Sequence, residues 1–305
     1  MARTPPASTP AAPGLGARAF VWLQYLLPQH LLSRGVYWLT RRRARWFKNA
    51  LIGSFLRGFK PDMSDALQPD ALVYPSFNEF FTRVLRPDAR PLAGGERCIV
   101  SPVDGTVSEA GALDGNRILQ AKGRDYSLQE LLAGQDALCA RLAGGRFATI
   151  YLAPYNYHRI HMPVAGTLRE AWLVPGRLFS VNTATAAQVP RLFARNERVV
   201  CVFDSPAGPF VVVLVGALFV GSMTTVWHGQ VTPARGPRRV QRLQPMAAAP
   251  ALQQPRGAEL GWFNMGSTVV VLMPPGMAHW VPGLAAGRVV RMGQQIGELE
   301  PSRAP

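Results

Sequence analysis

The clearest candidates for chemistry in this chain are two histidines three residues apart. His158 and His161 lie in the run YNYHRIHMP at residues 155–163. A metal site would need a third Cys, Asp or Glu ligand at a recognisable spacing, and none accompanies the pair, so the sequence predicts no metal. Acid–base catalysis and hydrogen-bonded structure remain as interpretations of the pair. The other three histidines stand among bulky apolar residues and are interpreted as structural or interfacial: His30, His228 and His279.

Two further residues could act beside a histidine. Asp104 opens an Asp-Gly turn between strand-like segments, where the ordinary role of an aspartate is to shape the hairpin. Ser267 follows Gly266 at the entry to a β-branched run, which a β-bulge would explain equally well. This is not the G-x-S-x-G elbow of serine hydrolases, because a strand follows the serine and the next glycine is Gly276. Taken singly, neither residue marks a catalytic site.

Strand patterns dominate the part of the chain that must position these residues. Runs rich in Val and Ile alternate with turn signals, at residues 199–203, 211–215 and 269–272. Two capping boxes of S-x-x-E type predict short helices, at Ser76 with Glu79 and at Ser127 with Glu130. Residues 233–257 show neither pattern and are predicted to form a flexible surface loop. The whole predicts an α+β fold with a β-rich barrel or sandwich core, spanning residues 61–305.

The N-terminal part has a different character. Residues 1–16, rich in Pro, Ala, Ser and Thr, are predicted to be a disordered tail. Residues 17–60 have a helical apolar pattern with many aromatic side chains. A basic cluster stands among them: Arg41, Arg42, Arg43, Arg45 and Lys48. The pattern predicts amphipathic helices at the surface of an anionic membrane, and packing on the chain's own domain with a solvated basic face is the alternative.

Charge and composition narrow the class of protein. The formal charge of +15 arises mainly within residues 1–61, which hold ten basic side chains and no acidic one. No nucleic-acid-binding motif accompanies this charge, so no nucleic-acid partner is predicted. The longest apolar stretches are shorter than the ~20 residues of a spanning helix. Three cysteines form neither a disulfide framework nor a zinc pattern, which indicates a reducing compartment.

Together, these stretches closely resemble the phosphatidylserine decarboxylase family. The blocks that carry the resemblance span roughly residues 60–300 in the family's order: DG at 104–105, YHRIHMP at 157–163, PGRLFSVN at 175–182, RNERV at 195–199, GAELGWF at 257–263 and GST at 266–268. One departure is Met265, where the family usually has Leu. That exchange conserves volume and leaves Gly266 and Ser267 unchanged.

The resemblance implies a proenzyme that cuts itself between Gly266 and Ser267, into a large β chain (1–266) and a small α chain (267–305). The Ser267 hydroxyl would attack the Gly266 carbonyl, His161 would take its proton, and Asp104 would hold the tautomer of His161. Asp, His, Ser is a known chain order for such a triad. His158 is a candidate acid or base for decarboxylation.

The resemblance also implies a cofactor and partners. Ser267 would become a covalent pyruvoyl group that forms a Schiff base with phosphatidylserine and accepts electrons as CO₂ leaves, giving phosphatidylethanolamine. The two chains would form a heterodimer that pairs again, attached peripherally to the cytoplasmic side of the cell membrane. Arg159 and Arg177 are candidates to bind the lipid phosphate.

Three other classes of protein were weighed against this one. A pyridoxal-phosphate decarboxylase needs a Schiff-base lysine, and Lys122 is the only lysine in the globular part. Residues 282–299 resemble half of a biotinyl or lipoyl carrier domain. Such carriers modify a lysine in the hairpin, and no lysine follows Lys122, so the alternative that remains is a non-catalytic membrane adaptor of the same sheet topology. A serine hydrolase that keeps Ser267 intact is the third. Cleavage before Ser267 would separate the decarboxylase from the last two.

Overall fold

The computed structural model describes residues 15–301, except for residues 122, 220–221, 234–237 and 247–251. Most of the predicted disordered tail, residues 1–14, therefore lies outside the described residues. Leu15 and Gly16, at its end, already belong to the first helix.

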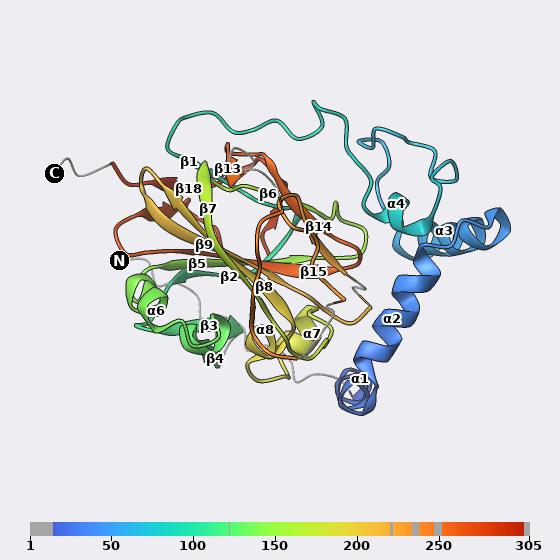
Figure 1. The fold of residues 1–305 in the computed structure, drawn as a ribbon, viewed down its shortest axis with the longest axis horizontal. Helices are drawn as coiled ribbons and strands as arrows, with labels where there is room; N and C mark the ends of the chain where they lie inside the picture. The colour runs from blue at the N-terminus through green and yellow to red at the C-terminus, as the bar shows by residue number, and fades with distance from the viewer. Residues whose placement is uncertain (1–14, 122, 220–221, 234–237, 247–251, 302–305) are drawn as a thin grey trace, which may run out of the picture.

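Three helices form an arm on one side of the molecule (Figure 1): α1 (Leu15–Leu26), α2 (Gln29–Thr40) and α3 (Arg45–Phe59). Pro28, which lacks an N–H group, stands at the junction of α1 and α2. α3 ends where Lys60 turns into the left-handed conformation, with φ of 48°. The helical pattern predicted for residues 17–60 is confirmed as three separate helices. In the described part of the chain, none of them has the length and apolarity needed to cross a bilayer.

The basic cluster predicted within these helices is divided between a turn and a buried site. Arg42 and Arg43 lie in the turn between α2 and α3, and their side chains are exposed, as is that of Arg45. Lys48 is buried, and its Nζ donates to the carbonyl oxygen of Leu72 at 2.7 Å. Large apolar side chains on the same arm are exposed: Leu15, Phe20, Trp22, Leu23, Leu26, Leu31, Trp38, Leu39, Trp46 and Phe59.

The short helix α4 (Phe77–Phe81) joins the arm to the rest of the molecule. Its N-cap is the predicted one, since the Ser76 hydroxyl accepts the N–H of Glu79 at 3.2 Å. The helix contributes to an aromatic cluster with α3, formed by Ile52, Phe55, Ala71, Phe77, Phe80 and Phe81. Met265 packs against this cluster and against the main core, so the residue before Gly266 lies where the two meet.

The main core is built on a nine-stranded antiparallel sheet with the order β12-β7-β8-β9-β15-β5-β2-β17, and with β13 beside β7. Its strands are β2 (Gly105–Ala112), β5 (Arg146–Leu152), β7 (Gly166–Val174), β8 (Arg198–Ser205), β9 (Gly208–Val215), β12 (Gln241–Arg242), β13 (Gln253–Gln254), β15 (Ser267–Met273) and β17 (Val289–Val290). The three Val- and Ile-rich runs lie in β8, β9 and β15, which confirms them as strands. β9 and β15 are almost wholly buried, which explains their continuous apolar sequence.

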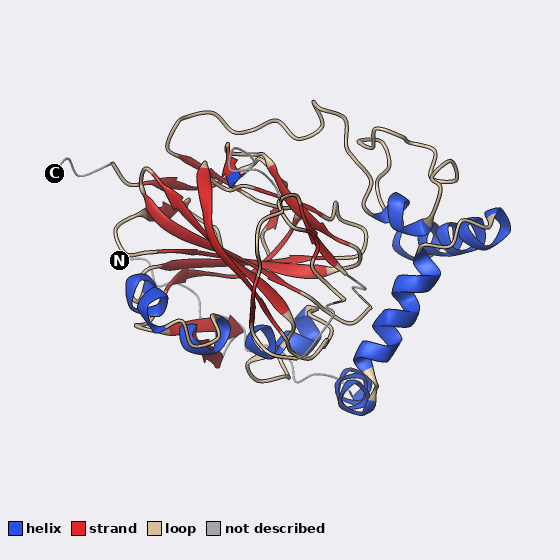
Figure 2. Cartoon of the chain, viewed as in Figure 1, coloured by secondary structure: helices blue, strands red, loops and turns tan. Residues whose placement is uncertain are grey.

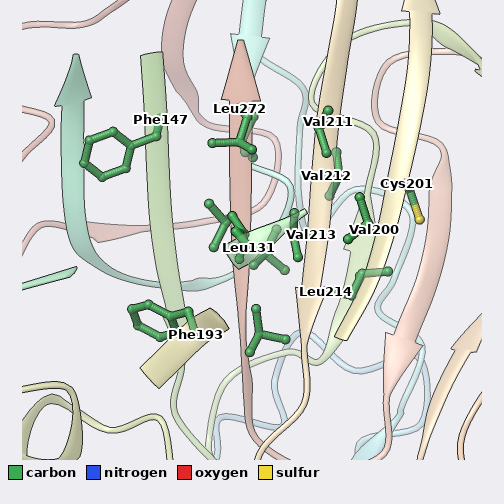
Figure 3. Packing of buried hydrophobic residues seen from close by; sticks show 14 of the residues in the cluster. Leu131, Phe147, Phe193, Val200, Cys201, Val211, Val212, Val213, Leu214 and Leu272 are labelled. Atoms are coloured by element: carbon green, nitrogen blue, oxygen red, sulfur yellow. The ribbon is translucent and has the colours of Figure 1, made fainter. Parts of the chain in front are cut away.

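Small helices cover the sheet from one side (Figure 2): α5 (Leu128–Leu131), α6 (Asp136–Leu142), α7 (Thr183–Ala186) and α8 (Leu192–Arg195). Leu131 of α5 lies beside Val213 of β9, and Phe193 of α8 belongs to the same core cluster (Figure 3). The capping box predicted at Ser127 and Glu130 is present at the start of α5.

Three smaller sheets complete the fold. One has the order β11-β10-β14-β6, with β6 (Arg159–His161), β10 (Met223–Thr225), β11 (Gly229–Gln230) and β14 (Glu259–Phe263). The others consist of β1 (Cys98–Val100), β16 (Ala278–Trp280) and β18 (Gln295–Leu299), and of β3 (Arg117–Ala121) with β4 (Arg124–Ser127). The mixture of helix and sheet is as predicted. The barrel is not, because the described strands leave β12 and β17 as separate ends of an open sheet.

The prediction of a flexible loop at residues 233–257 is wrong for two short segments. Gln241–Arg242 and Gln253–Gln254 both pair with β7. The pairing uses the backbone groups of β7 and needs no alternation of apolar and polar side chains, so the sequence of these segments does not predict strands. Residues 234–237 and 247–251 lie outside the described part of the chain.

Candidate active site

Ser267 is the first residue of β15, a strand held between β5 and β9 in the large sheet. Its side chain is fully buried, and among the described residues its Oγ has no hydrogen-bond partner. Leaving a buried hydroxyl unpaired costs about 1–3 kcal/mol. Such groups are few in native structures and mark places where a cost in stability serves another purpose.

Gly266 presents the peptide bond before Ser267 to a histidine. A methyl group placed on Gly266 would lie 3.9 Å from Nε2 of His158 and 3.3 Å from the carbonyl oxygen of Leu152. The backbone of Gly266 is not in the left-handed region, so the crowding around it, and not its φ angle, favours glycine here. The consequence is that an imidazole nitrogen lies beside the Gly266–Ser267 bond.

His158 is buried in a neutral form. Its Nδ1 donates to the carbonyl oxygen of Asn156 at 2.8 Å, which leaves the lone pair on Nε2. Among the described residues Nε2 has no partner, and the ring packs against Phe81 with 4.3 Å between centroids. Burial lowers the pKa of His158 to about 3, and the positive charge of Arg83 acts in the same direction. His158 is therefore an unprotonated base beside Gly266 at neutral pH.

His161 lies at the end of β6 with both ring nitrogens occupied. Nδ1 donates to the carbonyl oxygen of Gly257 at 2.8 Å, and Nε2 accepts from the hydroxyl of Tyr157 at 3.1 Å. Burial lowers the pKa of His161, while the bond to Gly257 and the charges of Glu259 and Asp104 oppose that shift. The lone pair of His161 is thus held by a hydroxyl that can rotate away.

Asp104 is engaged mainly with an arginine. Its carboxylate accepts from Nε of Arg90 at 3.0 Å, from Nη2 of Arg90 at 2.6 Å and from the N–H of Met292 at 2.8 Å. Arg90 also pairs with Asp65 at 2.7 Å. Asp104 acts on His161 through its charge. The tautomer of His161 is set by the hydrogen bond that its Nδ1–H donates to the carbonyl oxygen of Gly257. Within the described part of the chain, no hydrogen bond joins the side chains of Asp104, His161 and Ser267.

The two arginines singled out in the sequence have other partners. Arg159 forms two hydrogen bonds with Glu259, at 2.8 and 2.9 Å, and donates to the carbonyl oxygen of Thr82. Arg177 lies 6.0 Å from the ring centroid of Phe179. Arg83 is buried and its charge acts on His158, but no sequence motif marks it, because no pattern distinguishes a buried arginine after a short helix from an exposed one.

A chain of hydrogen bonds leads from the helical arm to the segment before Gly266. Nη2 of Arg41, at the end of α2, donates to the Ser222 hydroxyl at 3.1 Å. Asn264 donates through both its backbone N–H and its side-chain amide to the carbonyl oxygen of Ser222, each at 3.0 Å. The segment that carries Gly266 is therefore tied to the arm by polar contacts as well as by the packing of Met265.

Comparison with known proteins gives a consistent result. Residues 77–298 match the family model described as phosphatidylserine decarboxylase, and residues 19–60 match a second model described as PSD. A phosphatidylserine decarboxylase proenzyme of Pseudomonas putida (strain GB-1) is 52% identical over 282 residues, which cover 92% of this chain and 98% of that protein. The protein of the same name from Methylococcus capsulatus is 49% identical over 280 residues, covering 92% and 96%.

Proposed function

The chain belongs to the phosphatidylserine decarboxylase family, and from that premise we propose that it is a proenzyme which cuts itself between Gly266 and Ser267 to create its catalytic group. Its reaction is the decarboxylation of phosphatidylserine to phosphatidylethanolamine. The observation that supports the site of cleavage best is the buried, unpaired hydroxyl of Ser267, next to a peptide bond that faces an unprotonated imidazole nitrogen.

The cleavage needs only groups of the chain itself. Oγ of Ser267 attacks the carbonyl carbon of Gly266, the C–N bond breaks, and an ester joins the two residues. Loss of the α-proton of residue 267 then breaks its Cβ–O bond. This step leaves a carboxylate on Gly266 and dehydroalanine at position 267. Tautomerisation and hydrolysis release ammonia and leave a pyruvoyl group at the new N-terminus.

A base is needed in the first step, because a serine hydroxyl is a weak nucleophile until its proton is removed. We assign this role to His161, with Asp104 favouring the imidazolium by its negative charge. The match of both residues to the family's motifs supports the assignment. The hydroxyl of Tyr157 would have to turn away from Nε2 first, and such rearrangement is common between resting and reacting states.

His158 is assigned to the decarboxylation step. Its free Nε2 lies beside the position that the new N-terminus would occupy, so it can hold or return a proton there. The surroundings of Ser267 fit a small covalent group, since Oγ of Ser267 and Nε2 of His158 are both buried and have no hydrogen-bond partner within the described part of the chain. A pyruvoyl carbonyl supplies an electrophile for the substrate amine and an acceptor for the electron pair released with CO₂.

The helical arm is proposed as the membrane contact. Exposed Trp22, Trp38 and Trp46 stand with exposed arginines on the same arm, a combination that suits the headgroup region of an anionic bilayer. The attachment would be peripheral, and the cytoplasmic side of the cell membrane is proposed from the family resemblance and the free cysteines. The two product chains are expected to remain together as a heterodimer, and to pair again.

An intact-mass measurement of the purified protein tests the proposal. We expect a chain of residues 1–266 and a chain of residues 267–305 of roughly 4 kDa, by its share of 33.2 kDa, with the small chain blocked by a pyruvoyl group in place of serine. Ser267→Ala should stay a single chain, because alanine offers no hydroxyl for the attack.

Ser205→Ala serves as the control, since Ser205 lies in the β8–β9 hairpin and its hydroxyl donates to the carbonyl oxygen of Gly208. That variant should be cut as the parent is. A parent protein that stays whole in the presence of anionic lipid would contradict the proposal and leave the adaptor or the hydrolase. A Ser267→Ala chain that is cut would overturn the attack by the Ser267 hydroxyl as the route of cleavage.

A further inference from the structure

Arg83 stands out among the buried arginines because its guanidinium is not paired. The residue is 3% exposed, and among the described residues its Nε and Nη1 have no hydrogen-bond partner. Its Nη2 makes one long bond, 3.4 Å, to the carbonyl oxygen of Tyr155. Burial of a cation without a partner is costly, so a guanidinium in this condition calls for an explanation.

Other buried arginines show that the fold can pair a guanidinium fully. Arg198 uses Nε, Nη1 and Nη2 to donate to backbone carbonyl oxygens of its own domain. Arg90 pairs with two aspartates. Arg83 lies near acidic groups too, since the charges of Asp104 and Asp62 act on it, but neither forms a hydrogen bond with it. Its free donors are thus left for a group that the chain does not supply.

The position of Arg83 connects it with the cleavage site. It follows α4 by two residues, and the ring of Phe81 at the end of that helix lies against His158. The charge of Arg83 acts on His158, whose Nε2 is the atom beside Gly266. The backbone carbonyl oxygen that accepts the one bond of Arg83 belongs to Tyr155, a residue that is itself 49% exposed.

We propose that Arg83 binds the phosphodiester of the lipid headgroup and thereby holds the serine moiety against the group at position 267 and against His158. The proposal rests on the proposed function. An arginine is suited to the task because its Nε–H and Nη–H groups can donate in parallel to two phosphate oxygens. The site lies where α4 joins the helical arm to the sheets, so a headgroup that arrives from the arm would meet Arg83 before it meets residue 267.

The headgroup carries two anions, and the chemistry favours the phosphodiester over the carboxylate as the partner. The carboxylate leaves as neutral CO₂, so a cation bound to it would stabilise the substrate more than the transition state and would slow the reaction. The phosphodiester keeps its charge from substrate to product. A cation bound to the phosphodiester stabilises the substrate and the transition state equally. It also positions the carbon that bears the amine, because only one carbon and one oxygen separate that carbon from phosphorus.

The test uses mature Arg83→Gln and Arg83→Lys proteins with a short-chain phosphatidylserine as substrate. Loss of a charge-assisted contact should raise KM by about ten- to a hundredfold in Arg83→Gln, with kcat little changed. Arg83→Lys should show a smaller rise, because an ammonium keeps the charge but loses the paired donors. Arg86→Gln is the matched control, since the Arg86 side chain is half exposed and forms an ion pair with the exposed Asp88.

Short-chain phosphatidylethanolamine separates the two anions, because it keeps the phosphodiester and lacks the carboxylate. Its inhibition constant should rise in Arg83→Gln by the same factor as KM. A rise in KM with an unchanged inhibition constant would assign Arg83 to the carboxylate and overturn the proposal. Inorganic phosphate is the second probe: inhibition by it that is lost in Arg83→Gln, with both lipid constants unchanged, would assign the residue to free phosphate and also overturn it.

The outcome of the cleavage assay keeps this test apart from that of the proposed function. If the parent protein is not cut, the proposed function fails. If the parent is cut and Arg83→Gln has unaltered lipid constants, the inference about Arg83 fails alone. If neither Arg83 variant matures while Arg86→Gln does, Arg83 serves folding or cleavage, and its role in lipid binding is overturned.

Discussion

The two histidines of the site share a tautomer and differ in what faces Nε2. Each donates its Nδ1–H to a backbone carbonyl oxygen, of Asn156 in one case and of Gly257 in the other. Nε2 of His158 faces the Gly266 peptide without a partner among the described residues, whereas Nε2 of His161 is bonded to Tyr157. Proximity therefore favours His158 as the nearer base, and the family's motif pattern favours His161.

Replacing each histidine by glutamine decides between these readings. We expect His161→Gln to remain mostly uncut, because the base for the Ser267 hydroxyl is gone. His158→Gln should be cut and then decarboxylate slowly, by roughly 10²- to 10⁴-fold, the usual contribution of a positioned acid or base. Mass spectrometry measures the cleavage, and CO₂ release measures the turnover.

His279→Gln is the control for that pair, since His279 is half exposed and lies between two glutamates away from the cleavage site. It should behave as the parent in both assays. If His158→Gln is uncut and His161→Gln matures at the parental rate, the two roles must be exchanged.

Short motifs allowed the sequence to predict which residues could react, but not how they are connected. The Asp-Gly turn alone indicates a hairpin, and only the family resemblance assigns Asp104 to the site; its carboxylate is held by Arg90 and by the backbone of Met292, which is 188 positions away. Contacts between such distant positions depend on how the strands are ordered, and no local pattern carries that order. Arg83 was missed for the same reason.

Among the elements, those with local causes were predicted best. The helices after Ser76 and Ser127 were found because a capping box lies within four residues. The buried strands could be predicted because continuous runs of Val and Ile favour strands that are covered on both faces. β12 and β13 were not found, since their pairing with β7 depends on an edge that exists only after the sheet has formed.

The turn between α2 and α3 makes a specific prediction about membrane binding. Arg42 and Arg43 in the turn and Arg45 at the start of α3 are exposed, whereas Lys48 is buried, so changing these three arginines to Gln should remove three exposed positive charges from the arm. At about 1 kcal/mol for each charge near an anionic surface, affinity for phosphatidylglycerol vesicles should fall by roughly a hundredfold at low salt. Vesicle co-sedimentation measures the loss.

A triple change of Arg97, Arg141 and Arg291 to Gln removes the same charge from exposed positions outside the arm. This control should bind nearly as the parent does. The loss in the arm variant should shrink as salt is added, because exposed charges are screened. If the two triple variants bind vesicles equally well, the arm is not the membrane contact, and its helices serve only to pack on their own domain.

For the molecule as a whole, a partly buried glutamate makes the free energy of unfolding depend on pH. Burial raises the pKa of Glu197 from 4.5 to about 7, against the opposing charges of Arg238 and Arg34. Between these two pKa values the folded chain holds a proton that the unfolded chain has lost. The free energy of unfolding therefore falls as pH rises from 4.5 to 7, and the loss is complete above 7.

Glu197→Gln should remove this dependence. In the uncut Ser267→Ala background, the variant should gain up to about 3 kcal/mol over its parent between pH 4.5 and pH 8, by the shift in pKa. Urea denaturation at several pH values measures the difference. Glu96→Gln, at an exposed position, controls for the change in net charge. A Glu197→Gln curve parallel to its parent would contradict the prediction.

The central position of β15 in the large sheet indicates that folding comes before cleavage. The strand pairs with β5 from Ser267 to Met273 and with β9 on its other side, so its residues are enclosed only after the sheet has formed. Cleavage at its first residue would thus follow folding and turn one polymer into two. All three cysteines are unpaired and precede the cut, so no disulfide ties the pieces.

A mature molecule that unfolds must then refold by a bimolecular reaction, whose rate falls with dilution. The uncut chain refolds by a unimolecular one. Cleavage would remove the peptide bond that keeps the two parts together during folding. The cleaved enzyme would then stay active for a time set by its rate of unfolding, and not by the equilibrium between folded and unfolded states.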